Sequence, residues 1–197
     1  MAWPDLKWDG ERTGPLKGVR MVDMSSVVLG PFATLQFADL GAEVIKVESP
    51  AGGDPLRSWR KLHNGTSLWW YAQSRNKKSL TLDLKSEEGQ QIVRELVKTA
   101  DIVIENFRPG TLEGWGLGWD DLVKINPNLI MVRVSGYGQD GPYSQRPGFA
   151  AIAESMGGLR NLIGFPDRPP VRVGVSIGDT LASLYGVIGA LLAMHHL

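Results

Sequence analysis

Residues 18–48, GVRMVDMSSVVLGPFATLQFADLGAEVIKVE, predict a strand, a helix and a second strand in succession. The apolar runs at the two ends of this stretch are typical of short buried strands. Between them, Pro31 suits the first turn of a helix, apolar residues then recur at helical spacing, and Gly41 can end the helix. Such a unit is expected to place its two strands parallel, with a right-handed crossover.

The same alternation continues along the chain. SLTLDL (79–84) alternates like a strand, Ser86 can cap a helix with one apolar stripe, and DIVIENF (101–107) predicts the next strand. WDDLVKI (119–125) predicts a helix, and LIMVRVS (129–135) is typical of a strand covered on both faces. We therefore predict an α/β fold, a Rossmann-like doubly wound and mostly parallel sheet with helices on both faces.

Two segments do not fit this simple alternation. Residues 49–74 lack a clear period and are predicted to form a long excursion of the kind that often carries function. The closing segment 173–197 has leucines on more than one face, which predicts a deeply buried helix rather than a membrane span. Its cover is expected to come from a second copy or from a continuation of the chain.

Composition excludes several classes of function. The 197-residue chain has 21 basic and 21 acidic residues, so net charge gives no reason to expect nucleic acid or an anionic membrane as a partner. It has no cysteine, which excludes disulfides, thiolate metal sites and thiol nucleophiles and is consistent with a cytoplasmic location. Residues 1–18 are charged throughout and contain no apolar core of a signal peptide.

Two glycine-rich loops have a glycine spacing that suggests a dinucleotide-binding site, but the residues that follow them do not support it. GYGQDG (136–141) matches G-x-G-x-x-G, but prolines follow it where a helix should begin. GWGLG (114–118) precedes Asp120 and Asp121, which would repel phosphate at a helix start. Both loops are better explained as tight turns or as places where a ligand approaches the backbone.

Other charged and nucleophilic residues leave alternatives open. RNKKS (75–79) places three cations just ahead of a strand. They are explained either as a solvated surface patch or as a group that binds phosphate oxygens. GVSIG (174–178) has the G-x-S-x-G pattern of a hydrolase nucleophile elbow, but it lacks the preceding strand and the histidine on a separate later element that such a site needs. No set of His, Asp or Glu residues has metal-ligand spacing. Asp179 opens the apolar closing segment, either as a helix cap or as a functional carboxylate. Surface ion pairs explain a further set, Lys46, Glu48, Asp54 and Arg57.

Five segments in this order resemble the class III CoA-transferases of the formyl-CoA transferase and carnitine CoA-transferase type. They are GPFATLQFADLGAEVIKVESPAGGD (30–54), RNKKSLTLDLKSEEG (75–89), ADIVIENFRPGTLEGWGLGWDDL (100–122), NPNLIMVRVSGYGQDGPY (126–143) and VGVSIGD (173–179).

The resemblance implies transfer of CoA between an acyl-CoA and a free carboxylic acid, with no permanently bound cofactor. It places the family's nucleophile on Asp179, which would form an acyl anhydride and then an aspartyl-CoA thioester. It implies CoA contacts from Val27, Val28, Leu29, Gly30, Lys77 or Lys78, Asn106 and Phe107, with Tyr137 near the thioester. Gly136, Gly138 and Gly178 are the expected oxyanion donors. Without the resemblance, Asn106 and Phe107 would be explained as a turn residue and a core aromatic.

The resemblance also implies how the chain is organised. Residues 1–197 would be the N-terminal portion of the family's large domain, without its small second domain and returning C-terminal segment, and full-length members form interlocked homodimers. One alternative is a truncated, inactive CoA-binding module. A second is an α-methylacyl-CoA racemase, which is disfavoured because Phe149 stands where that enzyme needs a proton-carrying histidine.

Overall fold

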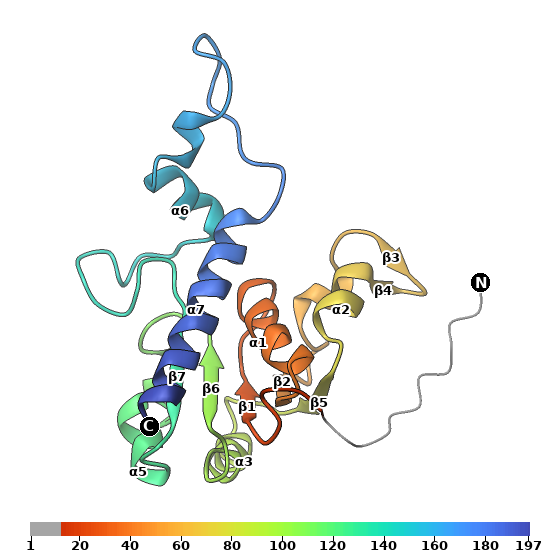
Figure 1. Ribbon diagram of the computed structural model, residues 1–197, viewed down its shortest axis with the longest axis vertical. Coiled ribbons are helices and arrows are strands. Elements are labelled where there is room, and N and C mark those ends of the chain that lie inside the picture. Colours follow the sequence, from red (N-terminus) through yellow and green to blue (C-terminus); the bar gives the residue numbers. More distant parts are fainter. Residues whose placement is uncertain (1–12) are drawn as a thin grey trace.

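A five-stranded parallel sheet forms the centre of the protein, which a computed structural model describes over residues 13–197 (Figure 1). The predicted polar start of the chain, residues 1–12, lies outside the described residues. The strand order is β5-β2-β1-β6-β7, and every neighbouring pair is parallel. The strands are β1 Arg20–Asp23, β2 Glu43–Glu48, β5 Lys77–Thr81, β6 Ile102–Glu105 and β7 Ile130–Arg133.

Helices cover both faces of this sheet. On one face, Phe37 of α1 and Ala190 of α7 pack with Met21 and Ile104, and on the other, Val93 of α3 and Leu122 of α5 pack with Val22 and Val103. This arrangement confirms the predicted doubly wound, Rossmann-like fold. The helices are α1 Leu29–Asp39, α2 Leu68–Gln73, α3 Glu87–Val97, α4 Thr111–Gly114, α5 Trp119–Ile125, α6 Ala150–Met156 and α7 Ile177–His196, with short 3-10 turns η1 Pro55–Ser58 and η2 Leu159–Leu162.

The local signals account for the predicted strand–helix–strand unit. Pro31 lies in the first turn of α1, and Gly41 follows the helix with a φ of 101°, a left-handed conformation that suits glycine. The Ser86 hydroxyl accepts a hydrogen bond from the Gly89 N–H at 3.0 Å and caps α3 as predicted.

The excursion over residues 49–74 is more ordered than its sequence predicted. It contains η1, a two-stranded antiparallel hairpin, β3 Leu62–His63 with β4 Thr66–Ser67, and the helix α2. Ser67 caps α2 by accepting a hydrogen bond from the Trp69 N–H. The absence of a clear period reflects the shortness of these elements, because a repeat of 3.6 residues cannot be recognised in a helix of six.

Helix α7 is only partly buried within residues 13–197, so its predicted deep burial stays an expectation that depends on cover from a second copy or a continuation of the chain. The helix packs against α1 and β7 along one side and leaves the other exposed (Figure 1). The helix is long and apolar enough to span a membrane. Core helices of soluble proteins can have the same length and composition, so these two properties do not identify a membrane span. The exposed apolar side chains are Leu181, Leu184, Tyr185, Ile188 and Leu192.

The edge strand β7 is covered on both faces, but only partly. Met131 packs against one core cluster, Ile130 and Val132 pack against the other, and all four strand residues are half-buried. The apolar run therefore identified a strand that contacts both layers, whereas its place at the sheet edge limits its burial.

Candidate active site

The strand order creates a crevice at the carboxyl ends of β1 and β6. After β1 the chain adds β2 and β5 on one side, and it then returns to add β6 and β7 on the other. At such a switch point the loops after the two central strands diverge, and ligands of doubly wound proteins bind there. A pocket of about 330 Å³ occupies this position. Its walls include residues 26–29 after β1, 106–109 after β6, 134–136 after β7, and Gly178 and Asp179 in the first turn of α7.

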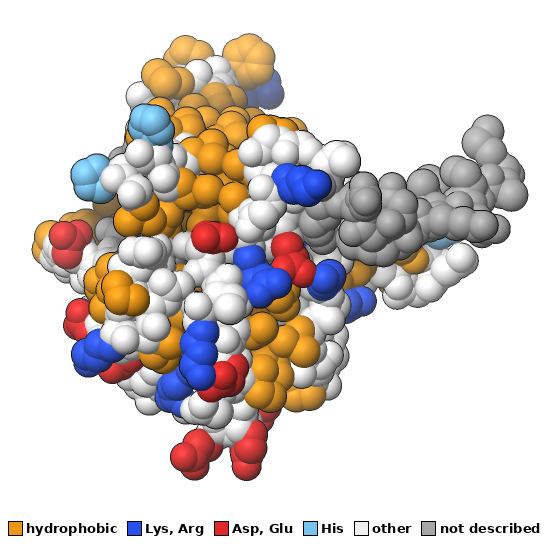
Figure 2. Space-filling model, turned by 60° about the horizontal axis from the view of Figure 1, so that its bottom comes forward, with side chains coloured by type: hydrophobic (Ala, Val, Ile, Leu, Met, Phe, Trp, Pro, Cys, Tyr) orange, Lys and Arg blue, Asp and Glu red, His pale blue; other side chains and the backbone are white. Residues whose placement is uncertain are grey.

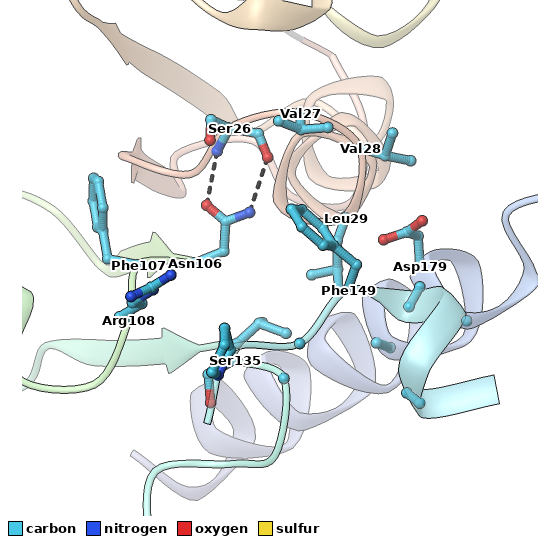
Figure 3. A pocket seen from close by; sticks show the side chains of 18 of the residues that line it. Ser26, Val27, Val28, Leu29, Asn106, Phe107, Arg108, Ser135, Phe149 and Asp179 are labelled. Carbon is cyan, nitrogen blue, oxygen red and sulfur yellow. Dashed lines mark hydrogen bonds between the residues drawn. The ribbon is translucent and has the colours of Figure 1, made fainter. Parts of the chain in front are cut away.

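The Asn106 side chain holds the first wall of the pocket. Its Oδ1 accepts from the Ser26 N–H and its Nδ2 donates to the Ser26 carbonyl, both at 2.9 Å (Figure 3). One amide thus satisfies both backbone groups of Ser26 across 80 residues of sequence. Asn106 fixes the turn after β1 relative to the end of β6.

Asp179 lies across the pocket from Asn106 and Phe107, with Leu29 and Phe149 between them in Figure 3. It is half-buried, and its carboxylate makes no hydrogen bond or ion pair within residues 13–197. The carboxylate therefore does not cap α7 through a side-chain hydrogen bond. Burial raises its pKa, with a smaller increase from Glu154 and an opposing effect of Arg172.

Glycines allow three backbone segments to meet at this end of the pocket. A Cβ on Gly178 would lie 2.9 Å from the Ala150 Cβ, and one on Gly136 would lie 2.8 Å from the Gly148 Cα. Because real Cβ atoms do not approach so closely, these positions require glycine. The first contact brings the start of α6 against the helix turn that carries Asp179, and the second brings the loop after β7 against the segment that precedes α6.

Behind the turn after β1, a buried network of charges replaces the surface ion pairs that sequence allowed. Lys46 and Asp54 form an ion pair of 3.4 Å whose side chains are 3% and 1% exposed. Glu48 is equally buried and binds the more exposed Arg57 through two hydrogen bonds of 2.7 and 2.8 Å. Although burial raises the pKa of Glu48, hydrogen bonds from Arg57, Ser79 and the Asp54 N–H outweigh it and lower the pKa to about 2.

The predicted phosphate-binding lysines lie apart from the main pocket and within β5, not ahead of it. Lys77 is buried, donates to the Pro31 carbonyl at 2.7 Å and faces Asp23 at 3.4 Å. Burial lowers the pKa of Lys77 to about 8, against the opposing charge of Asp23. Lys78 is exposed and pairs with Glu43 at 2.5 Å. Both lysines line a second, smaller cavity of about 190 Å³ that Trp70 and Arg57 also border.

Asp23 is the buried counter-ion of this region. Burial raises its pKa, but the charges of Lys46 and Lys77 and hydrogen bonds from Ser25 and Thr34 outweigh burial and leave the pKa below its usual value. The sequence signal for such a network was a lysine between the apolar residues of the strand EVIKVE.

The structure brings together most of the predicted site residues. Three lie outside the main pocket in addition to the lysines. Gly30 is buried beneath the turn, where a Cβ would collide with the Ser25 side chain. Tyr137 stacks edge-on against Tyr143 at 5.6 Å, and the Gly138 carbonyl accepts from Ser135. The predicted residues that line the pocket are Val27, Val28, Leu29, Asn106, Phe107, Gly136, Gly178 and Asp179.

Sequence reasoning missed two arginines of the pocket wall, Arg108 and Arg146. Arg146 stacks on the Tyr143 ring with its guanidinium carbon 4.1 Å from the ring centre. Neither arginine belongs to a recognisable charge cluster, so nothing local distinguished it from a surface residue. Within residues 13–197, no group of His, Asp and Glu side chains is arranged to hold a metal ion.

Fold and pocket together define a doubly wound α/β protein with a carboxylate at the end of its switch-point crevice. The chain belongs to CoA-transferase family III, whose family model matches residues 16–197. This match confirms the resemblance that the five ordered segments indicated.

Curated relatives carry more particular names. The chain is 56% identical over 182 residues to the succinyl-CoA–D-citramalate CoA-transferase of Chloroflexus aurantiacus, a match covering 92% of this chain and 45% of the relative. It is 45% identical over 186 residues to the succinyl-CoA:glutarate CoA-transferase of Mus musculus, covering 94% of this chain and 42% of the relative. The chain thus spans somewhat less than half the length of these relatives.

Solved structures agree with the fold. A CAIB/BAIF family protein from Brucella suis superposes with a TM-score of 0.89 at 40% identity, over 94% of this chain and 50% of the other. The protein Rv3272 from Mycobacterium tuberculosis superposes with a TM-score of 0.86 at 38% identity, over 94% of this chain and 52% of the other.

Proposed function

We propose that the protein to which this chain belongs transfers CoA between an acyl-CoA and a carboxylic acid, with Asp179 as the nucleophile. One observation carries this proposal: a half-buried carboxylate without hydrogen-bond or ion-pair partners in residues 13–197 lies in the same pocket as the turn after β1. A carboxylate attacks well only when it is ionised and poorly hydrated. Burial strips water from Asp179, and the N-terminal end of α7 favours its negative charge.

The proposed reaction proceeds by attack at three carbonyl carbons, those of the acyl donor, of Asp179 and of the second acid. An Asp179 oxygen attacks the thioester carbonyl, the carbon–sulfur bond breaks, and CoA leaves as a thiolate while an acyl–aspartyl anhydride forms. The thiolate then attacks the Asp179 carbonyl and releases the first acid as its carboxylate. The carboxylate of the second acid then attacks the Asp179 carbonyl of the resulting aspartyl-CoA thioester, the carbon–sulfur bond breaks, and a second acyl–aspartyl anhydride forms as the CoA thiolate leaves. The thiolate attacks the acyl carbonyl of this anhydride, which yields the new acyl-CoA and releases Asp179 as a free carboxylate.

Each addition places a negative charge on a carbonyl oxygen, which requires hydrogen-bond donors. We assign this role to backbone N–H groups of Gly136 and Gly178, because both residues line the pocket and neither has a side chain to obstruct it. Gly138, which lies outside the pocket, is not needed for this assignment.

CoA is proposed to extend from Asn106 and Phe107, along residues 27–29, to Asp179. The convergence of these residues on one pocket supports this placement. Lys77 and Lys78 border the neighbouring cavity, so contact with CoA phosphates would require the ligand to continue behind α1. The names of the relatives lead us to propose succinyl-CoA as the acyl donor.

The remainder of the site is proposed to come from further polypeptide, either a continuation of the chain or a second, interlocked copy. The exposed apolar face of α7 supports this, because such a surface is costly to leave in water. The match of this chain to only about half of each relative supports it as well.

Replacing the nucleophile tests the proposal. In the full-length polypeptide containing this chain, Asp179→Asn should abolish transfer from succinyl-CoA to carboxylic acids, because an amide cannot form the anhydride. CoA affinity should stay within about twofold, since Asn preserves the shape of the side chain. Mass spectrometry of the unsubstituted enzyme with succinyl-CoA should find CoA, less one water, on the peptide that contains Asp179.

Asp140→Asn provides the matched control. Asp140 is exposed in the loop after β7 and does not line the pocket, so its replacement should leave transfer unchanged. Full transfer activity in Asp179→Asn would exclude the proposed nucleophile, whereas CoA binding without transfer by the unsubstituted protein would favour a binding module.

A further inference from the structure

Side chains form hydrogen bonds with most of the backbone N–H and C=O groups of residues 25–27, in the turn after β1. The Ser25 N–H donates to Asp23, Lys46 donates to the Ser25 carbonyl, and Asn106 binds both backbone groups of Ser26. The Val27 N–H donates to Asp54. This turn forms the pocket wall assigned above to CoA, so its shape determines the shape of the site.

Val27 is the strained residue of the turn. Its φ of 70° lies in the left-handed region, which a β-branched side chain disfavours because Cβ approaches its own carbonyl oxygen. Strained residues persist only where their surroundings impose the conformation, and they concentrate at functional sites. Some contact must therefore hold Val27 in place.

The Asp54 carboxylate supplies that contact. Both of its oxygens lie 3.1 Å from the Val27 nitrogen, and one also accepts from the Leu56 N–H at 2.9 Å. Lys46 forms an ion pair of 3.4 Å with the same carboxylate, and the Asp54 N–H donates to Glu48 at 3.0 Å. Asp54 is thus fixed at its own backbone as well as at its carboxylate.

We propose that Asp54 is a positioning residue for CoA binding: its carboxylate, oriented by Lys46, holds Val27 in the left-handed conformation that shapes the pocket wall. Asp54 does not line the pocket, so it acts on the ligand through the Val27 backbone. The identity of the ligand as CoA rests on the proposed function, whereas the link between Asp54 and Val27 rests on the geometry alone.

A double-mutant cycle tests this link in the full-length polypeptide containing this chain, with CoA itself titrated calorimetrically. Asp54→Asn should weaken CoA binding about tenfold, because an amide replaces one of the two acceptor oxygens and cannot pair with Lys46. Glycine adopts a φ of 70° without strain, so in a Val27→Gly background the same change should weaken binding less than about twofold. Equal weakening in both backgrounds would overturn the proposal.

Two further variants separate positioning from stability. Asp54→Glu keeps the charge facing Lys46 but displaces the carboxylate from the Val27 N–H, so it should weaken CoA binding even if Asp54→Asn fails to fold; unchanged binding would overturn the proposal. Asp83→Asn is the matched control, because Asp83 also accepts from a backbone N–H, that of Lys85, but in an exposed turn. It should leave CoA affinity unchanged.

Kinetics distinguish this inference from the proposed function. Asp54→Asn should raise the KM for acyl-CoA about tenfold and lower kcat less than about threefold, because Asp179 is carried by a different element. CoA binding without transfer by the unsubstituted protein would exclude the proposed reaction and leave the cycle interpretable. Failure of the unsubstituted protein to bind CoA would overturn both.

Discussion

The pKa of Asp179 depends on its burial and on two charged neighbours, Arg172 and Glu154. Ala150 and Glu154 lie one turn apart on the same side of α6, and Ala150 is the residue that contacts Gly178. Glu154 is buried and pairs with the Nε of Arg172 at 3.4 Å. Burial raises the pKa of Asp179, Arg172 opposes that increase and Glu154 adds to it. The carboxylate proposed as the nucleophile is thus influenced by a cation and an anion that bind each other.

This arrangement predicts the pH dependence of transfer. As the proposed nucleophile, Asp179 must be ionised to attack, so kcat/KM should fall as the pH drops through its raised pKa. Glu154→Gln removes a negative charge, lowers that pKa and should move the acidic limb of the profile to lower pH. Arg172→Gln should move it to higher pH. The profile of Asp140→Asn should match that of the unsubstituted enzyme, and a common shift in both test variants would contradict this account.

Among the elements, β2 connects the sheet to the pocket wall. Its apolar residues pack in the core, while Lys46 and Glu48 extend from its carboxyl end to the turn after β1, to η1 and to β5. Ser79 of β5 donates to Glu48 at 2.6 Å, and Arg57 of η1 donates to it and stacks 3.8 Å over the Trp70 ring. One buried carboxylate therefore holds three elements together.

The depressed pKa of Glu48 predicts how stability depends on acid. In the folded protein this pKa is about 2, against an ordinary value of 4.5, so the folded state binds fewer protons than the unfolded state between these pH values. The stabilisation is complete above about pH 4.5 and is lost as the pH falls toward 2.

Glu48→Gln removes this stabilising charge. The free energy of unfolding, measured by urea titration at several pH values, should be lower than that of the unsubstituted chain near neutral pH and should fall less steeply below pH 4.5. Asp167→Asn, at an exposed loop position, should retain the original slope. Identical slopes for Glu48→Gln and the unsubstituted chain would contradict the role of Glu48.

At the scale of the whole molecule, charged and apolar surfaces are unevenly distributed. Figure 2 shows hydrophobic side chains gathered in a continuous area in the upper part of the face it presents, with most charged side chains below. Helix α7 carries five exposed apolar side chains on the side away from α1 and β7, including Leu184 and Ile188. Contiguous apolar surface of this kind is unusual on a monomer and marks a contact area.

The 197-residue chain studied alone should therefore bind a fluorescent apolar dye. Replacing Leu184 and Ile188 together by Asp should reduce the dye fluorescence to less than about half, because both side chains belong to the exposed face of α7. Ile92→Asp, at a single exposed position on α3, should change it little. Equal fluorescence in all three proteins would show that the α7 face does not bind the dye.

Local sequence patterns predicted the five strands of the main sheet, their parallel arrangement and the helices α1, α3, α5 and α7, and five ordered segments indicated the family. These features are local: a period of two or 3.6 residues, a capping serine or a glycine after a helix acts within a few positions. The short elements within residues 49–74 escaped prediction because they contain too few residues to show a period.

Which residues form the site depends on contacts between segments that lie far apart in the sequence. The strand order β5-β2-β1-β6-β7 brings Ser26, Asn106 and Asp179 to one crevice, and no local pattern specifies that order. Burial of Lys46 with Asp54 likewise depends on contacts between distant segments, although either residue alone would be expected at the surface. The left-handed Val27 follows from those contacts, because its own side chain disfavours the conformation that Asp54 holds.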